Sequence, residues 1–402
     1  MADNKDKKVL NVPALRFPEF IKSWECSILE KLSKKIGDGI HSTPSYDDNG
    51  TFYFINGNNL NEGKIVITSS TKRVSEKEAY KNNAENLEAN SILMSINGTI
   101  GNVALYHNEP IMLGKSACYI NSKDNIDKNY LFYYLQYPKT QLYFEAELTG
   151  TTIKNLSLQS IRKTKIYIPT IEEQHKISRF LQKIDERIST QNKIIEKLET
   201  LIKGIVDSIF TANEFPKVPF KEIYVRAGEG GTPATSNPEY YDNGTIPFIK
   251  IDDLQNKYIK TNKDCITELG LQKSSAWIVP ANSIIYSNGA TIGAISINLF
   301  PVCTKQGILG VVPKADINVE FLYYFMTSTA FTKAVERIVT EGTMRTAYLK
   351  DINHIPCPVP CSVKQDEIAK LLSTLSEKLE NEVIFQMKLQ KQKEFLLSQM
   401  FI

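Results

Sequence analysis

Cysteine and histidine are scarce in this chain of 402 residues, which contains six cysteines and four histidines. Only Cys357 and Cys361 are close together, and they do not form a CxxC pair. Since the sequence has no CxxC pair and only one of the four histidines, His354, stands close to cysteines, we expect no metal site. Reduced, partly buried thiols are the simpler interpretation.

Long hydrophobic runs are also absent. The sequence has no stretch of 18 apolar residues, which excludes a transmembrane helix. Its polar beginning lacks the hydrophobic segment of a secretory signal, so we expect a cytoplasmic protein. The net charge of +3 permits binding to nucleic acid but does not by itself argue for it.

Catalytic signatures are missing as well. The sequence contains no P-loop, no HExxH motif and no GxSxG motif. The segment Asn237–Tyr240 resembles the cofactor loop of an amino-methyltransferase, but Glu239 stands where a second proline belongs. The chain therefore lacks a recognisable set of nucleophile, base and oxyanion site.

What the sequence does contain is a long heptad pattern between residues 168 and 210. Apolar residues recur there at steps of four and three, with Lys and Glu between them, which predicts a coiled-coil helix. A weaker copy runs from residue 360 to residue 401, so we expect the two helices to pair. The expected pairing positions are Ile177, Leu181, Ile184, Ile188, Ile195, Leu198, Ile202, Ile368, Leu372, Leu375 and Leu379.

The chain repeats itself at an interval of about 190 residues. NSILMSINGTIG at Asn90–Gly101 returns as NSIIYSNGATIG at Asn282–Gly293, and Gln174 returns as Gln365. Nearly constant offsets over many segments indicate a tandem duplication, in which each unit holds short β-like runs and helices before one long helix. We therefore predict a mixed α/β (α+β) fold, with two domains related by a pseudo-twofold axis and separated by two long antiparallel coiled-coil helices.

Domain boundaries follow from the repeat. We assign a first domain, a central helix, a second domain and a C-terminal helix to residues 1–168, 169–213, 214–360 and 361–402, respectively. Within the first domain, Val12–Glu25 predicts an extended, docked arm and Ser27–Lys35 a short helix. The aromatic segment from residue 129 to residue 147 predicts two short helices interrupted near Pro138.

Polar loops that contain glycine are the candidates for ligand contacts. The repeated turns NGTIG and NGATIG expose backbone N–H groups and a hydroxyl, which suits a phosphate contact. A tight hairpin with positive φ explains the same pattern without a ligand. The candidate DNA-binding residues near these and similar loops are Thr43, Lys72, Arg73, Asn97, Thr99, Lys115, Thr151, Lys154, Thr232, Lys250, Lys273, Asn288, Thr291, Lys305, Thr343 and Arg345.

The two units differ most in their central loops, residues 64–85 and 257–277. A shared scaffold with divergent loops suits two readers of different base sequences, because base edges are read by side chains specific to each target. Two readers on a helical spacer would recognise a split target.

With these features the chain resembles the specificity subunit of a type I restriction-modification system. The opening VPALRFPEF is similar to the first segment of that family, and the block at Asn90–Gly101 resembles a strand–turn–strand unit of its target recognition domains. The run IPTIEEQHKISRFLQKID resembles the start of its central conserved helix. The order of domain, helix, domain, helix extends the resemblance over nearly the whole chain.

The resemblance implies that each domain is a target recognition domain for one half of a bipartite, asymmetric sequence in double-stranded DNA. It implies that the helices dock two methyltransferase (modification) subunits, and that restriction–translocase subunits join the complex. S-adenosylmethionine, ATP and Mg²⁺ then belong to those partners, and this chain binds no cofactor itself. Two alternatives remain open from the sequence: a catalytically complete DNA methyltransferase, and a purely structural coiled-coil scaffold.

Overall fold

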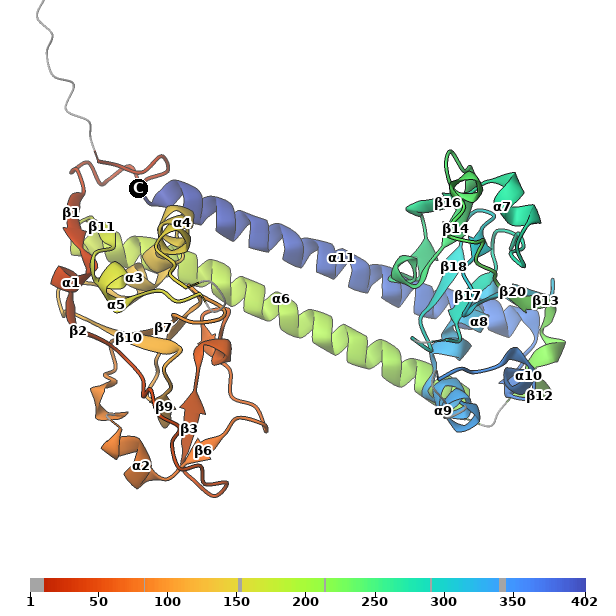
Figure 1. The fold of residues 1–402 in the computed structure, drawn as a ribbon, viewed down its shortest axis with the longest axis horizontal. Coiled ribbons are helices and arrows are strands. Elements are labelled where there is room, and N and C mark those ends of the chain that lie inside the picture. The colour runs from red at the N-terminus through yellow and green to blue at the C-terminus, as the bar shows by residue number, and fades with distance from the viewer. Residues whose placement is uncertain (1–10, 83, 151–153, 213–214, 290, 340–344) are drawn as a thin grey trace, which may run out of the picture. The chain divides into compact units, whose positions relative to one another are not determined.

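A computed structural model describes residues 11–82, 84–150, 154–212, 215–289, 291–339 and 345–402 of the chain. The chain divides into two compact units, of which unit 1 contains residues 1–191 and 385–402 and unit 2 contains residues 192–384. Each unit holds one mixed α/β domain together with parts of the helices α6 (Ile171–Thr211) and α11 (Ser362–Met400), drawn in green and blue in Figure 1.

The domain of unit 1 contains strands on several small sheets and five short helices in its described part. Its strands are β1 (Glu25–Ile28), β2 (Ser33–Asp38), β3 (Phe52–Ile55), β4 (Leu60–Asn61), β5 (Lys64–Ile65), β6 (Arg73–Val74), β7 (Ser91–Ser95), β8 (Val103–Leu105), β9 (Ile111–Leu113), β10 (Ala117–Ser122) and β11 (Lys165–Ile168). Its helices are α1 (Leu29–Leu32), α2 (Glu76–Lys81), α3 (Lys128–Leu135), α4 (Pro138–Ala146) and α5 (Leu158–Arg162).

The domain of unit 2 repeats most of this order. Its strands are β12 (Lys217–Pro219), β13 (Tyr224–Glu229), β14 (Ile246–Ile249), β15 (Tyr258–Ile259), β16 (Asp264–Ile266), β17 (Ile284–Ser287), β18 (Ile295–Asn298), β19 (Cys303–Thr304), β20 (Ile308–Pro313) and β21 (Pro356–Pro358). Its helices are α7 (Glu268–Gln272), α8 (Val319–Thr327), α9 (Thr329–Ile338) and α10 (Leu349–Ile352).

The sheets show the duplication directly. The order β2-β10-β7-β8 in unit 1 returns as β13-β20-β17-β18 in unit 2, and β6-β3-β9 returns as β16-β14-β19. Successive side chains of a strand point to opposite faces, and every residue of β7 is buried, so both of its faces are covered. Ile92 and Met94 join the core beneath α3, whereas Leu93 joins a separate cluster on the opposite face with Ile55 and Ile111.

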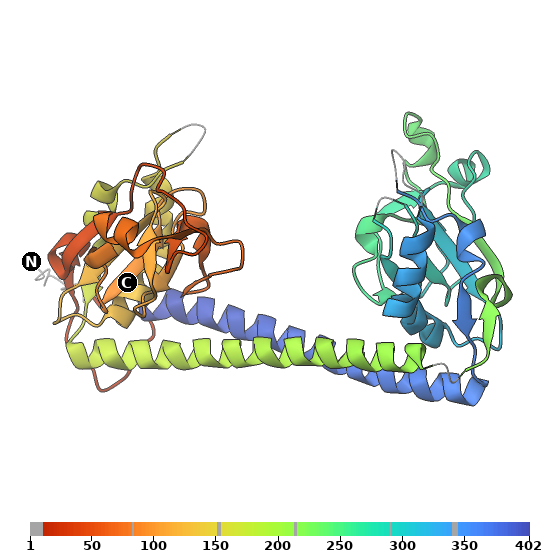
Figure 2. The same ribbon diagram turned by 90° about the horizontal axis from the view of Figure 1, so that it is seen from below.

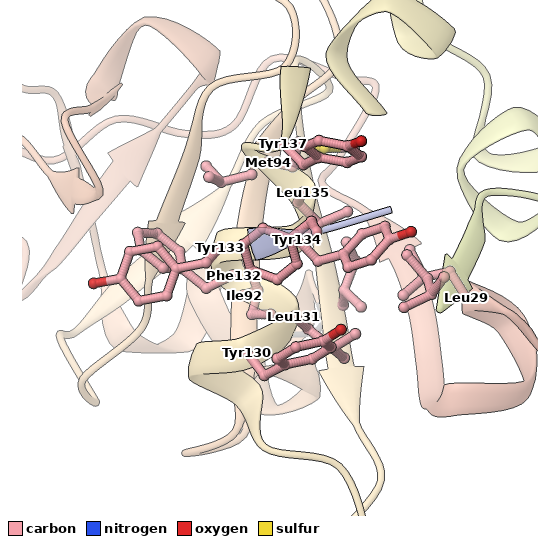
Figure 3. Packing of buried hydrophobic residues seen from close by; sticks show 14 of the residues in the cluster. Leu29, Ile92, Met94, Tyr130, Leu131, Phe132, Tyr133, Tyr134, Leu135 and Tyr137 are labelled. Carbon is pink, nitrogen blue, oxygen red and sulfur yellow. The ribbon is translucent and has the colours of Figure 1, made fainter. Parts of the chain in front are cut away.

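The aromatic helix α3 forms the centre of the unit 1 core. Figure 3 shows Tyr133 and Tyr134 pointing to different sides of this helix. The buried tyrosine hydroxyls find partners, as buried polar groups must. Tyr130 donates to the carbonyl of Tyr167 at 2.6 Å, and Tyr134 donates to the carbonyl of Ile402 at 3.1 Å. Pro138 is the first residue of α4, so the predicted interruption is confirmed.

The predicted helix at Ser27–Lys35 is wrong over most of its length. Only α1 is helical, because the flanking residues pair with strands that are distant in sequence. Ser27 lies opposite Ile166 on β11, and Lys35 lies opposite Asn121 on β10. Tertiary pairing thus overrides the local apolar periodicity.

The N-terminal arm is docked, as predicted, but the prediction that it is extended is wrong, because the backbone N–H of Trp24 donates to the carbonyl of Asn11 at 2.9 Å and closes the segment into a loop. Arg16 forms a two-pronged contact with the Glu173 carboxylate, with N···O distances of 2.7 and 2.8 Å, and Trp24 Nε1 donates to the same carboxylate at 3.3 Å. The backbone N–H of Leu15 donates to the carbonyl of Gln399 at 2.9 Å. The arm therefore fastens the start of α6 and the end of α11 within unit 1.

The repeated glutamines near the start of each long helix have one shared role. Gln174 Oε1 accepts from the backbone N–H of Asp127 at 3.0 Å, and its Nε2 donates to the carbonyl of Pro169 at 3.0 Å. Gln365 makes the same contacts with the N–H of Asn318 and the carbonyl of Pro360, at 2.9 and 3.0 Å. Each buried amide therefore ties the loop before α3 or α8 to its helix.

Within each unit, one end of α6 lies against the opposite end of α11. In unit 1, Leu181 shares a core with Leu397, and Asp185 forms a 2.7 Å ion pair with Lys393. Figure 2 shows the blue end of α11 beside the start of α6 in this unit. In unit 2, Phe210 near the end of α6 shares a core with Leu372 near the start of α11. The two helices are antiparallel in both places.

Equivalent tyrosines join each domain to a helix. Tyr133 on α3 donates to Asp185 on α6 at 2.7 Å, and burial and the charge of that carboxylate raise the pKa of Tyr133 well above its usual value. Tyr324, its counterpart on α8, lies 2.9 Å from Ser376 Oγ on α11. The same position in the repeat thus fixes domain to helix with different chemistry.

A buried lysine adds to the contact between the domain of unit 2 and α11. Lys257 Nζ donates to Tyr324 Oη at 3.0 Å and to Ser373 Oγ at 2.8 Å, and it lies 3.2 Å from the Glu320 carboxylate. Although burial opposes the charge on both groups, the pKa of Lys257 is raised and that of Glu320 is lowered. Hydrogen bonds from Ser373 and Tyr258 to Glu320, together with the lysine charge, outweigh its desolvation.

None of the helices in the described part of the chain combines the length and apolarity that crossing a membrane requires. The six cysteines are unpaired, and three of them, Cys118, Cys303 and Cys357, are buried. Burial raises the pKa of the Cys118 thiol to about 12, so it is an inert core residue.

Candidate nucleic-acid interface

The repeated glycine turn is a tight hairpin in unit 1. Strands β7 and β8 pair antiparallel, with Met94 opposite Val103, and the N–H of Ser95 donates to the carbonyl of Asn102 at 2.8 Å. Gly98 and Gly101 have φ values of +76° and +85°, a region that residues with a Cβ rarely adopt. The hairpin interpretation is therefore confirmed, and the phosphate contact stays a prediction.

Four of the predicted DNA-binding residues of unit 1 gather around this hairpin. Thr99 Oγ1 donates to the carbonyl of Gly57 at 3.3 Å, and the Gly57 N–H donates to Ser116 Oγ at 2.9 Å, next to Lys115. Asn97 forms a β-bridge with Asn155, which places the neighbouring Lys154 at the same end of the domain. Lys115, Lys154 and Thr99 are exposed. We call Asn97, Thr99, Lys115 and Lys154 the turn cluster.

Three further candidates of unit 1 lie beside this cluster or on a neighbouring sheet. Thr43 is exposed and follows Ile40, whose N–H donates to the carbonyl of Leu113 at 3.0 Å, just before Lys115. Lys72 and Arg73 are exposed at the edge strand β6 of the sheet β6-β3-β9. Because β9 ends shortly before Lys115, this sheet leads directly into the turn cluster.

In unit 2 the equivalent turn is built around a buried asparagine. The Asn288 side chain is 1% exposed, and its Nδ2 donates to the carbonyl of Ala347 at 3.1 Å. The Ala347 N–H donates back to the Asn288 carbonyl at 2.9 Å. Asn288 therefore braces the turn from inside, and its side chain is not presented at the surface of unit 2.

The cations of unit 2 lie in different settings. Lys305 is exposed, and its N–H donates to the carbonyl of Ile249 at 3.0 Å, beside Lys250. Lys250 forms a 2.9 Å ion pair with Asp264, which offsets its charge. Thr232 Oγ1 accepts from the N–H of Gln306 at 3.3 Å, so it joins the same loops. Lys273 is exposed at the end of α7.

Thr291 and Arg345 line a cavity of about 300 Å³ between the turn and the helices α8 and α9. In unit 1 the equivalent glycine, Gly101, lines a cavity of about 310 Å³ together with Gln141, whose Nε2 donates to the Gly101 carbonyl at 3.1 Å. Thr332, which stands at the repeat position of Gln141, lines the cavity of unit 2. Two other candidates, Thr151 and Thr343, lie outside the described residues.

The side chains at the predicted helix-pairing positions are buried to different degrees. Ile177, Leu181 and Ile184 pack in the unit 1 core with the end of α11, while Ile202, Ile368 and Leu372 pack in the unit 2 core. Ile188 is buried, and the remaining positions are half-buried. The half-buried residues are Ile195, Leu198, Leu375 and Leu379.

Three residues that take part in stacking contacts were not predicted from the sequence: Tyr53, Arg226 and Trp277. Tyr53 lies beneath Arg73, with the guanidinium carbon 4.9 Å from the ring centroid, and Trp277 lies beneath Arg226 at 4.1 Å. The sequence signal that could have pointed to Trp277 is the rarity of tryptophan, which occurs twice in the chain.

Comparison with known proteins agrees with this architecture. The sequence profile described as "Type I restriction modification DNA specificity domain" matches residues 21–200 and again residues 217–388. The type I restriction enzyme MjaIX specificity subunit of Methanocaldococcus jannaschii is 24% identical over 398 residues, which cover 94% of this chain and 92% of that protein. The HindI specificity subunit of Haemophilus influenzae is 31% identical over 159 residues, or 38% of this chain and 34% of that protein.

Two solved structures share the fold. The crystal structure of the S subunit of a type I restriction-modification system from M. genitalium has a TM-score of 0.56 at 18% identity, covering 97% of this chain and 99% of that one. A chain from a structural study of complex assembly in the type I R-M system has a TM-score of 0.59 at 14% identity, covering 94% and 97%.

Two copies of a DNA specificity domain, each followed by a long helix, define a non-catalytic DNA-recognition subunit. The chain belongs to the type I restriction-modification DNA specificity family. The predicted family and the mixed α/β fold class with long helices are thereby confirmed.

Proposed function

We propose that this subunit recognises a bipartite, asymmetric sequence in double-stranded DNA, with one domain for each half. The observation that carries the proposal is that two domains of one topology differ at matching surface positions. Tyr53 faces Arg73 across β3 and β6, whereas Pro247 faces Cys265 across the equivalent strands β14 and β16. Different side chains on one scaffold suit different base sequences.

The turn cluster of unit 1 is proposed to hold the phosphate backbone. Lys115 and Lys154 are exposed and have no carboxylate partner among the described residues. Cations at phosphates give affinity that depends on salt and not on base sequence, because binding releases condensed counterions. Backbone N–H groups of the hairpin add neutral donors.

Lys115→Ala and Lys154→Ala are each expected to weaken binding to specific and nonspecific duplexes alike, since a phosphate contact carries no sequence information. Each substitution should lower the slope of log K against log salt by about 0.9. Fluorescence anisotropy over a salt series, on the complex with its modification subunits, measures both effects. Lys183→Ala on α6, where Lys183 pairs with Glu186, is the control. Specific binding that does not depend on salt would contradict the whole proposal.

We further propose that the helices set the number of base pairs between the half-sites and dock two modification subunits, which restriction–translocase subunits then join. At 1.5 Å per residue, a helix the length of α6 is roughly 60 Å long. In unit 2, Leu201 and Leu371 on the helices are 50% and 51% exposed. A groove of about 430 Å³ runs beside Leu371, lined by Ile209 and Phe215 among others. Exposed apolar grooves of this kind suit a partner helix.

Leu371→Lys is expected to weaken binding of the modification subunit about 10-fold or more, because a charge would be buried in an apolar contact. Isothermal titration of the full chain with the purified modification subunit checks this. Leu269→Lys serves as the control, since Leu269 is an exposed apolar residue on α7 of the same unit. Equal affinities of the two variants would argue against docking at this groove.

In this proposal S-adenosylmethionine, ATP and Mg²⁺ enter the complex through the modification and restriction subunits. The family to which the chain belongs supplies DNA specificity, which supports a division of roles in which this chain holds no cofactor. Uptake of labelled S-adenosylmethionine by the isolated chain would contradict this division of roles.

A further inference from the structure

Arginine is rare in this chain, which has eight arginines among its 48 basic residues. Several of the eight have evident roles in the fold or on the helices. Arg16 binds Glu173, Arg162 donates to the carbonyl of Ile36 at 3.0 Å, and Arg187 lies over Phe385 on the helices. In the described part of the two domains, only Arg73 and Arg226 are stacked on an aromatic ring.

In unit 1, Arg73 is held in place from two sides. Its Nη2 donates to Tyr53 Oη at 3.2 Å, and its guanidinium carbon lies 4.9 Å from the centroid of that ring. The two residues are direct partners across β3 and β6, and the N–H of Asp47 donates to the Arg73 carbonyl at 3.0 Å. Arg73 is exposed and has no ion pair among the described residues, so most of its N–H donors remain available.

In unit 2, Arg226 is held by a different device. Its guanidinium carbon lies 4.1 Å from the Trp277 ring, which rests on two glycines of neighbouring strands. A Cβ added at Gly310 would come within 3.0 Å of that ring, and one added at Gly228 within 3.4 Å. A β-bulge between Tyr224 and Arg226 redirects the strand at this point. Arg226 is also exposed and has no ion pair in the described part of unit 2.

The two arginines do not occupy equivalent positions of the repeat. Cys265 stands on β16 where Arg73 stands on β6. Gly37 on β2, the counterpart of Gly228, is instead covered by the ring of Tyr119 from the adjacent strand. The duplicated scaffold has therefore acquired a stacked arginine twice, at different places. Both arginines lie on strands that lead into polar loops. In unit 2, β13 ends at Glu229, whose carboxylate accepts a hydrogen bond from the Gly307 N–H at 2.6 Å.

We infer that Arg73 and Arg226 are specificity-determining residues that each read a guanine, one in each half of the DNA target. The inference rests on the proposed function. Guanine presents two acceptors, N7 and O6, in the major groove, and the planar fork of arginine matches them with two parallel hydrogen bonds. Stacking on a ring orients that fork in advance, and the absence of a neighbouring carboxylate leaves it free for a base.

The test uses the full chain assembled with its modification subunits, on a duplex whose target is first established by methylome sequencing. Each guanine of the target is replaced in turn by 7-deazaguanine, which lacks the N7 acceptor. In each half-site one replacement is expected to weaken binding about 10-fold or more. Arg73→Ala should abolish that sensitivity in one half-site, and Arg226→Ala in the other, because the contact to N7 is then already absent.

Two further variants make the result decisive. Arg73→Gln is expected to shift the preference at its position from guanine toward adenine, since glutamine matches N6 and N7 of adenine. Arg187→Ala removes a stacked arginine from α6 and should leave the sensitivity at every position unchanged. A variant that binds all sequences more weakly by one factor, or that keeps the 7-deazaguanine effect, overturns the assignment of that arginine. A half-site without a G·C pair overturns it as well. Absence of sequence-dependent binding by the wild-type complex would instead refute the proposed function.

Discussion

Arg16→Ala is expected to lower the free energy of unfolding of unit 1 by about 3 kcal/mol. The Glu173 side chain is 1% exposed, so removing its cationic partner leaves a carboxylate buried without compensation. Trp24 Nε1 remains as a single neutral donor at 3.3 Å, which cannot replace a two-pronged ion pair. The arm would also lose one of its anchors on α6, the contact of Arg16 with Glu173, together with the hydrogen bond from Arg16 to the Lys22 carbonyl within the arm.

Native-state hydrogen exchange measures this effect in each unit separately. Amides of the unit 1 core should lose protection, and those of unit 2 should keep it. Arg179→Ala is the matched control, because Arg179 is an exposed arginine on the same helix, and its replacement should cost less than about 0.5 kcal/mol. If both variants lost protection equally, the ion pair would not be what stabilises the arm.

Phe401→Ala is expected to destabilise unit 1 by about 3–5 kcal/mol, the usual cost of removing a buried aromatic side chain. Phe401 is 3% exposed, and its ring lies 5.5, 5.4 and 5.9 Å from the rings of Tyr130, Tyr134 and Tyr137. The substitution would leave a cavity among three tyrosines of the unit 1 core, which close packing does not readily fill.

Phe395→Ala provides the comparison, since Phe395 lies on α11, shortly before Phe401, and is 59% exposed. It should change stability by less than about 0.5 kcal/mol. Unfolding followed by near-ultraviolet circular dichroism, together with hydrogen exchange of α3 amides, distinguishes the two variants. A small effect of Phe401→Ala would mean that the end of α11 does not complete the core of the first domain.

The elements that could be predicted from the sequence are those with a strong local or repeated signal. The long helix appears in the 3.5-residue spacing of its apolar residues, and the paired hairpins appear because one block returns almost unchanged at Asn282–Gly293. The break near Pro138 follows from the chemistry of proline itself. Each of these signals depends on residues within one segment or on its copy.

The candidate site could be predicted only in part. Lys115 and Lys154 were named from their nearness to the repeated turn, and the structure brings both to it. Asn288 was named for the same reason, yet it is buried, because Ala347 hydrogen-bonds to it from 59 residues away. Trp277 was not singled out, since what it does depends on the two glycines beneath its ring. Exposure and stacking are set by partners that no local pattern contains.

The sequence by itself determined that the chain is duplicated, that each copy ends in a long amphipathic helix, and which family it belongs to. Tertiary structure alone decided which polar residues face outward and which brace the fold. It also decided which arginines lie on aromatic rings, as Arg73 does on Tyr53 and Arg226 on Trp277. The reason is physical: apolar periodicity and repeats are properties of one segment, whereas burial and stacking arise only when strands distant in sequence pack together.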